Sequence, residues 1–147
     1  MGASCSVRGN RGLMPILTVP ITAHGAILDV GIATIPIYST TVLTRRSLLD
    51  TGASRTAVRP SCLGLVGAPS FDVAEVTRPG GSGKIWVPAH EVRLRFGGAV
   101  GPGRWFDLQV VAVAPADPDI DILLGIDALS RTALFWDGPS HIVRLVC

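Results

Sequence analysis

Glycine and proline interrupt the apolar runs of this chain so often that they limit what it can fold into. The 147 residues include 17 Gly and 11 Pro, and no apolar run reaches the ~18–20 residues that a membrane-spanning helix needs. Proline disfavours helix interiors, and glycine weakens helices and strands alike. Short runs rich in Val, Ile, Leu and Thr, separated by turn residues, favour an all-β sandwich or barrel.

The expected strands are short, and several alternate apolar with polar residues, as a half-buried strand does. In residues 91–96, for example, every second residue is apolar. A helix is expected only over residues 126–131, with a second short turn near residues 56–65 that Pro60 limits. The expected strands are residues 16–21, 26–32, 35–38, 47–50, 71–77, 84–87, 91–96, 106–113, 120–124, 133–136 and 141–146.

The length of the chain predicts a single domain. Residues 1–12 are small and polar with Gly and Arg, and we expect them to be a flexible N-terminal lead-in to a domain of residues 13–147. Near the other end, residues 137–140 read Asp-Gly-Pro-Ser between two apolar pairs. This segment predicts a hairpin turn.

Charge and composition exclude several classes of function. The net charge is only +2 and the mean hydropathy is +0.45, which argues against disorder. The arginines are scattered and aromatic residues are 5% of the chain, so neither a basic patch nor a base-stacking surface for nucleic acid is expected. The surplus of apolar residues raises the question of a protein partner that covers some of them.

The cysteines and the N-terminus bear on location. Cys5, Cys62 and Cys147 are an odd, widely separated set, which favours free thiols in a reducing cytoplasm. Because none lies in a Cys-x-x-Cys pair, no metal site is expected, and nothing in the sequence indicates a cofactor. The first residues lack the apolar region of a signal peptide. They do match an N-myristoylation pattern, so membrane attachment through acylated Gly2 and Cys5 is an alternative.

The sharpest motif is residues 48–54, which read Leu-Leu-Asp-Thr-Gly-Ala-Ser. Here Asp50 follows two leucines that we expect to be buried, and it precedes a tight turn. Gly52 lets a backbone amide approach the carboxylate without a side chain in the way, and Thr51 and Ser54 supply hydroxyls that can orient it. Asp-x-Gly is also a common turn signal, but a turn alone requires neither the leucines nor the residues that follow Gly52.

This motif resembles the catalytic motif of the retropepsin-like aspartic proteases, an apolar pair followed by Asp-Thr/Ser-Gly-Ala. Two further segments resemble that family. Leu123, Leu124 and Gly125 are similar to the apolar-Gly segment that passes through the catalytic loop and leads into a short helix. Residues 76–85 look like the family's flap, a hairpin with a glycine-rich tip, and residues 135–145 resemble its closing strands.

The resemblance implies an all-β fold, a retropepsin-like closed β-barrel or sandwich with one short C-terminal helix and one lobe per chain. It also implies an aspartic endopeptidase. That chemistry uses two carboxylates that share a proton, whereas this chain has one such motif, so the second carboxylate would be Asp50 of another copy in a homodimer. A water activated by this pair would attack a peptide or protein substrate.

The family likeness also assigns supporting roles. Thr51 would link the two catalytic loops by hydrogen bonds, and the flap would close over an extended peptide. The residues expected to support the pair are Thr51, Gly52, Ala53 and Ser54. The residues expected in the flap or against the substrate are Thr77, Gly80, Gly81, Ser82 and Trp86.

Other interpretations remain open beside the enzyme. A catalytically idle retropepsin-like module for dimerisation or peptide binding is the main alternative, although such a module has no need of the Asp50 carboxylate. A glycosidase needs two different acids within reach, and no partner motif for Asp50 exists.

Residues 117–121 begin like a calcium-binding EF-hand loop but lack its Gly and Glu. Arg55 departs from the family pattern by placing a large cation near the loop, either on the surface or paired with a carboxylate.

Overall fold

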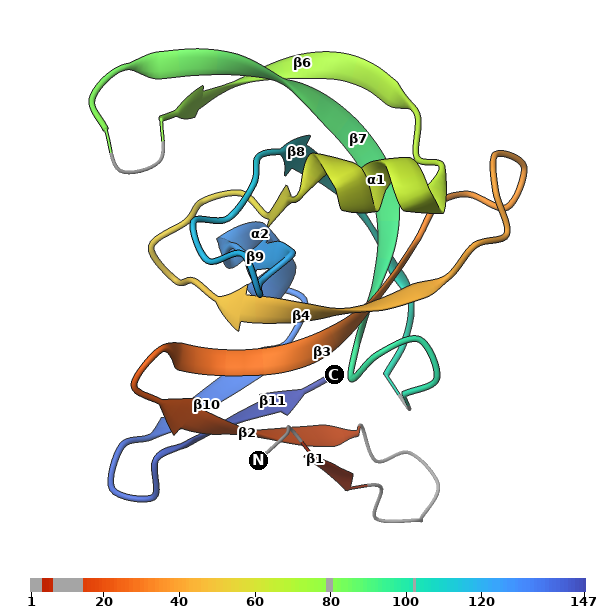
Figure 1. The fold of residues 1–147 in the computed structure, drawn as a ribbon. Helices are drawn as coiled ribbons and strands as arrows, with labels where there is room; N and C mark the ends of the chain where they lie inside the picture. The colour runs from red at the N-terminus through yellow and green to blue at the C-terminus, as the bar shows by residue number, and fades with distance from the viewer. Residues whose placement is uncertain (1–3, 7–14, 79–80, 102) are drawn as a thin grey trace.

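The structure, a computed structural model, describes residues 4–6, 15–78, 81–101 and 103–147. Strands dominate, as predicted, and two short helices accompany them (Figure 1). The elements are β1 (Ser4–Ser6), β2 (Ile16–Thr22), β3 (Gly25–Ala33), β4 (Leu43–Leu49), β5 (Ala57–Val58), α1 (Pro60–Val66), β6 (Ser70–Thr77), β7 (Lys84–Phe96), β8 (Phe106–Ala112), β9 (Ile122–Leu124), α2 (Ile126–Leu129), β10 (Ala133–Asp137) and β11 (Ile142–Val146).

The strand pairings connect the centre of the molecule in a ring. β3 pairs with β4, β4 with β9, β9 with β5, β5 with β8, β8 with β7, and β7 returns to β3. The pairs β4–β9 and β5–β8 are parallel. The hairpin of β6 and β7 arches over one end, and β10, β11, β2 and β1 lie at the other (Figure 1). Strand β9 therefore lies between β4 and β5, which places two distant parts of the chain side by side.

Alternation along the strands builds the core. In β7 the side chains of Val92, Leu94 and Phe96 are buried, whereas Arg93 and Arg95 between them are half-exposed, as a strand with one face in the core requires. Apolar side chains from β2, β3, β8, β9 and β11 complete the main cluster. A second, smaller cluster lies beneath the β6–β7 hairpin and consists of Ala57, Ala74, Val87, Ala89 and Val111.

Four of the predicted strands need correction. Residues 35–38 form a turn, in which the Tyr38 N–H donates to the Ile35 carbonyl at 2.9 Å, and Pro36 has no N–H to give a neighbouring strand. Residues 84–87 and 91–96 belong to one strand, β7. Strand β7 tolerates Pro88 because at this residue it pairs only with β6 and not with β8. Proline lacks an N–H and is accepted in a strand where one side is unpaired. The expected strand at 47–50 begins earlier, at Leu43.

One helix was predicted correctly, and the role of Pro60 in the other was not. Residues 126–129 are helical, within the expected 126–131. Near residues 56–65, however, Pro60 begins a helix instead of limiting one, because the first helical position needs no N–H donor. Helix α1 ends at Gly67, whose φ of 72° is the left-handed conformation that glycine adopts most readily. The described residues contain no helix long and apolar enough to cross a membrane.

Part of the expected lead-in is a strand. Ser4–Ser6 pair antiparallel with β2, so that Ser4 lies opposite Thr18 and Ser6 opposite Ile16. The proposed acylation site Gly2 lies outside the described residues, and so does the side chain of Cys5.

Candidate active site

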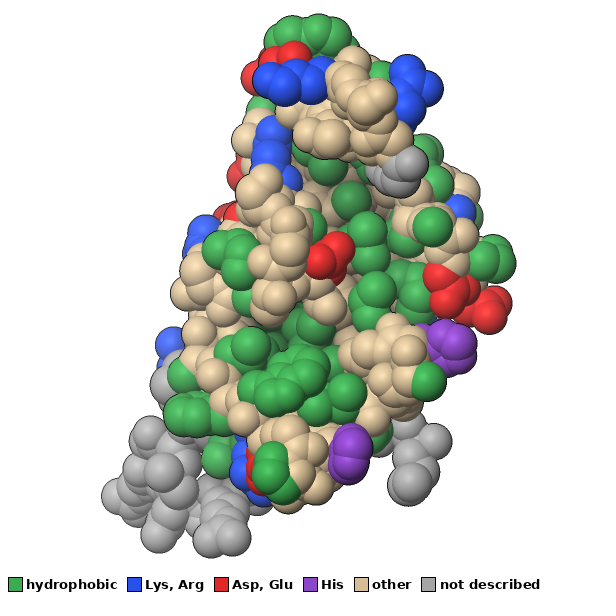
Figure 2. All heavy atoms as spheres, turned by 90° about the vertical axis from the view of Figure 1, so that its left-hand side faces the viewer, with side chains coloured by type: hydrophobic (Ala, Val, Ile, Leu, Met, Phe, Trp, Pro, Cys, Tyr) green, Lys and Arg blue, Asp and Glu red, His purple; other side chains and the backbone are tan. Residues whose placement is uncertain are grey.

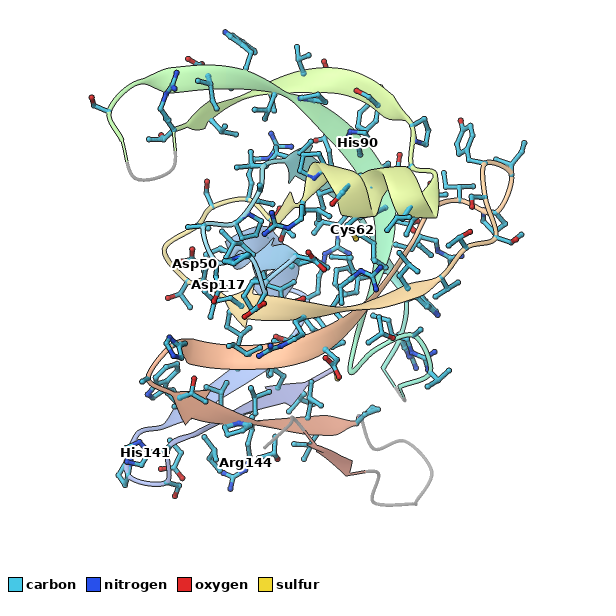
Figure 3. The ribbon with its side chains drawn as sticks, in the orientation of Figure 1. Asp50, Cys62, His90, Asp117, His141 and Arg144 are labelled. Atoms are coloured by element: carbon cyan, nitrogen blue, oxygen red, sulfur yellow. The ribbon has the colours of Figure 1, made fainter. Side chains whose placement is uncertain are left out.

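Asp50 lies where the chain leaves the end of β4. Strand β9 runs parallel beside β4, with Leu49 opposite Leu124, and the Asp50 N–H donates to the Leu124 carbonyl at 3.0 Å. Leu48 and Leu49 are half-buried, not fully buried as expected, and Leu49 packs against the main apolar cluster. Asp50 itself is half-buried and points out of the fold between β4 and the following loop (Figure 3).

The loop after Asp50 folds back on its carboxylate. The Gly52 N–H donates to Asp50 Oδ1 at 3.0 Å, and the Ala53 N–H donates to the Asp50 carbonyl at 3.2 Å. A backbone amide that donates to a carboxylate holds its orientation. Thr51 and Ser54 are exposed, and their hydroxyls make no hydrogen bond with any residue that the structure describes.

The segment that contains Gly125 passes directly against this loop. A Cβ at Gly125 would lie 2.6 Å from the Arg55 carbonyl carbon and 3.0 Å from the Ala53 oxygen, closer than van der Waals contact allows. One residue later, the Ile126 N–H donates to the Ala53 carbonyl at 2.8 Å. Only glycine leaves room for the two backbones to approach in this way. The structure thus brings Leu123, Leu124 and Gly125 to the loop that carries Asp50.

A buried hydrogen-bond network anchors the loop from behind. The Thr56 hydroxyl donates to Asp127 Oδ1 at 2.7 Å and accepts the Gly125 N–H at 3.1 Å, and the Thr56 N–H donates to Asp127 Oδ2 at 3.1 Å. Thr56 is fully buried. Sequence reasoning missed this pair, which lies 71 residues apart. The only local indication of this network in the sequence was that a threonine, Thr56, stands between the loop and the apolar residues of β5.

We expect Thr56→Val to lower the free energy of unfolding by about 1–3 kcal/mol, because the Gly125 N–H and the Asp127 carboxylate would lose a buried partner. Urea unfolding followed by circular dichroism measures this effect. The matched control is Thr41→Val in an exposed loop, which should change the unfolding free energy by less than about 0.5 kcal/mol. Equal unfolding midpoints for the two variants would contradict the proposed anchor.

A pocket of about 460 Å³ opens beside the loop. The loop and strands β5, β8 and β9 form one side, and the end of the β6–β7 hairpin forms the other. Figure 2 views the face on which the loop and the hairpin tip lie, with apolar side chains gathered in the hollow beneath the hairpin. The lining residues are Gly52, Ala53, Ser54, Arg55, Ala57, Glu75, Val76, Thr77, Lys84, Val111, Val113 and Leu123.

Comparison with known proteins identifies the fold. No protein-family model and no curated protein matches the sequence. The crystal structure of a retropepsin-like aspartic protease from Rickettsia conorii matches with a TM-score of 0.51 and 16% sequence identity, over 99% of this chain and 95% of that one. The chain has a retropepsin-like fold. At this sequence identity the similarity shows a shared architecture only.

Residues 76–85, the segment expected to be a flap, lie at the end of the β6–β7 hairpin. Thr77 lies opposite Lys84 at the end of its ladder and lines the pocket. The Arg78 N–H donates to the Gly83 carbonyl at 3.0 Å to close the turn. Gly81 and Ser82 are exposed in this turn and do not line the pocket, whereas Gly80 lies outside the described residues.

The structure does not bring Trp86 into the pocket of this retropepsin-like fold. Its side chain is 68% exposed, and it does not line the pocket, although its cross-strand neighbour Glu75 does. The neighbouring residues Ile85 and Val87 face the smaller apolar cluster instead, because side chains alternate along a strand.

Two acidic residues in the segment before β9 have structural partners. Asp117 Oδ1 accepts the Asp119 N–H at 2.8 Å, and Asp121 pairs with Arg59 at 3.0 Å and with Arg45 at 3.4 Å. Burial raises the pKa of the nearby Cys62 thiol, an effect that Arg45 opposes. Within the described residues, no three His, Cys, Asp or Glu side chains are grouped so that they could hold a metal ion.

Proposed function

We propose that the chain is an aspartic endopeptidase whose catalytic pair consists of Asp50 from each of two copies in a homodimer. The observation that carries the proposal is the local geometry of Asp50. Its carboxylate receives the Gly52 N–H at 3.0 Å, on a loop held from behind by Gly125 and Thr56. This loop leads directly into an open pocket. A preorganised carboxylate beside a pocket that can receive a substrate is what hydrolysis by an activated water requires.

The second carboxylate has to come from another chain. Glu75 is the one acidic residue among the described residues that line the pocket, and it pairs with Lys84 across the hairpin at 3.8 Å. Two carboxylates a few ångströms apart cannot both ionise, so they share one proton. A twofold axis beside Asp50 would bring two identical loops together and create such a pair from a single motif.

The reaction then needs no group beyond the two carboxylates and a water molecule. The ionised Asp50 takes a proton from the water as the water oxygen attacks the peptide carbonyl carbon, and the protonated Asp50 donates its proton to the carbonyl oxygen. In the collapse of the tetrahedral intermediate, the Asp50 that took the proton from water donates it to the amide nitrogen, the other Asp50 takes a proton back from a hydroxyl of the intermediate, and the carbon–nitrogen bond breaks to release the amine and the carboxylic acid. An extended peptide can lie beneath the β6–β7 hairpin and add main-chain hydrogen bonds, in the manner of strand addition.

Mixed dimers test the shared pair directly. Wild-type protein and Asp50→Asn protein are mixed at constant total concentration, allowed to exchange subunits, and incubated with a mixed peptide library from about pH 3 to about pH 7, a range that covers carboxylate dyads. Because a dimer with one Asn lacks the pair, an equal mixture should retain about one quarter of the wild-type activity. Mass spectrometry of the cleavage products measures it.

The control replaces the exposed Asp119 by Asn, and an equal mixture of this variant with wild type should keep full activity. Retention of one half in the Asp50 mixture, or an active protein that sediments as a monomer, would contradict the shared pair. A dimer that binds peptides but cleaves none would support the idle peptide-binding module instead.

A further inference from the structure

The pocket beside the catalytic loop carries an unbalanced positive charge. Its charged lining residues are Arg55, Glu75 and Lys84. Glu75 and Lys84 pair with each other at 3.8 Å on the hairpin. No carboxylate of the described residues lies within the 4.0 Å ion-pair distance of Arg55. Arg55 is half-buried and lines the pocket, so its positive charge is not balanced by an ion pair there.

The backbone of Arg55 is held firmly on both sides. Before it, the Ala53 carbonyl accepts the Ile126 N–H at 2.8 Å. After it, the Thr56 N–H donates to Asp127 at 3.1 Å, and Gly125 packs against the Arg55 carbonyl itself. A side chain that starts from a fixed backbone loses less entropy when it binds a ligand. The position of Arg55 is therefore suited to recognition.

Arg55 lies on the pocket side of the segment between Ser54 and Ala57. Thr56 points back to Asp127, away from the pocket. Arg55 and Ala57, on either side of it, both line the pocket. The wall that continues from Ala57 is apolar and consists of Val111, Val113 and Leu123. A ligand group for this pocket would combine a short aliphatic stem with a negatively charged end.

We propose that Arg55 makes this pocket a subsite for an acidic side chain, above all glutamate, of the bound peptide; this inference rests on the peptide-directed function proposed above. The methylene groups of a glutamate contact the apolar wall, and its carboxylate accepts paired hydrogen bonds from the guanidinium. Lysine and arginine side chains of the peptide are repelled by the same group. Arg55 then determines the sequence preference of the protein and takes no part in the bond-breaking step.

The test compares peptides that differ only in Glu against Gln, placed in turn at each position around a scissile bond found with the mixed library. For the wild-type protein, Glu at one position should raise kcat/KM about five- to tenfold over Gln, as a charge-assisted hydrogen bond in a partly exposed pocket would. Arg55→Gln should lower this ratio to about one, and Arg55→Glu should make Lys the favoured residue there. Because the measured quantity is a ratio within each variant, a general loss of activity does not affect it.

The matched control is Arg144→Gln. Arg144 is exposed on β11, at the end of the fold opposite the hairpin (Figure 3), and its variant should keep the wild-type ratio. A ratio near one at every position for wild type, or a preference for Glu that persists in Arg55→Gln, would overturn the inference.

The same peptides separate this inference from the proposed function. If the wild-type protein cleaves nothing, the endopeptidase proposal fails, and fluorescence anisotropy of labelled Glu and Gln peptides then decides the subsite. Tighter binding of the Glu peptide by about fivefold, lost in Arg55→Gln, would support the acidic subsite in a peptide-binding module. Equal binding of both peptides would overturn it.

Discussion

Replacement of Asp50 by Asn is expected to lower kcat for peptide cleavage by roughly a thousandfold or more, the scale on which general acid–base groups act. Asparagine keeps the shape of the side chain and an oxygen that can accept the Gly52 N–H, but its amide can neither take a proton from water nor share one with the opposite copy. In the Asp50→Asn homodimer both members of the pair are lost. Cleavage of a peptide found with the mixed library measures the effect.

The fold should survive this change. The bonds around residue 50 that involve the backbone, from the Asp50 N–H to Leu124 and from the Ala53 N–H to Asp50, do not depend on the carboxylate. We therefore expect the variant to keep its dimerisation and to unfold within about 1 kcal/mol of wild type. The exposed Asp119→Asn serves as the control for activity. An Asp50→Asn protein that is folded and still cleaves at the wild-type rate would rule out the proposed catalytic role.

Gly125→Ala is expected to have the largest effect on stability, a loss of about 3 kcal/mol or more from the free energy of unfolding. The added methyl would lie 2.6 Å from the Arg55 carbonyl carbon and 2.7 Å from its oxygen. Both atoms belong to the backbone, and the backbone is held there by the Ile126–Ala53 bond and by Thr56. No side-chain rotation can relieve the contact, so the loop that carries Asp50 has to move.

Thermal and urea unfolding measure this loss, and cleavage by any folded fraction should fall as well, because the loop that orients Asp50 is displaced. Gly64→Ala in helix α1 is the matched control. A Cβ there meets nothing within 4 Å, and alanine is the better helix former, so this variant should gain about 0.5–1 kcal/mol. A Gly125→Ala protein as stable as wild type would show that the close passage of β9 and the loop is wrong.

Local patterns accounted for much of the architecture. The alternation in residues 91–96 and the Gly and Pro between the apolar runs predicted most strands, because pleating and turn geometry are local properties. Where an element depended on a distant neighbour, prediction was weaker. The two residues of β5 carry no pattern of their own and are a strand only because β8 and β9 lie on either side. Residues 35–38 are apolar yet exposed in a turn.

The candidate site divides in the same way. The residues around Asp50 could be recognised because the motif and its turn chemistry lie within a few positions, and Gly125 was assigned to the site through the resemblance to the retropepsin-like family. The hydrogen bonds of Thr56 with Asp127 could not, because they join residues 71 positions apart. Trp86 was expected near the substrate, but the register of the hairpin turns it outward.

By itself the sequence determined that the chain is built from short strands and turns, that it carries one Asp-Thr-Gly motif, and that a catalytic pair would need a second copy. The first two follow from the local sequence, and the third follows from the resemblance of the single motif to a family whose chemistry uses two such carboxylates. Only the tertiary structure decided that β9 passes between β4 and β5, that Gly125 packs against Arg55, and that Arg55 lines a pocket with no carboxylate of the described residues within ion-pair distance of it. Those features depend on which distant backbones pair, and strand pairing is a long-range choice that no local pattern encodes.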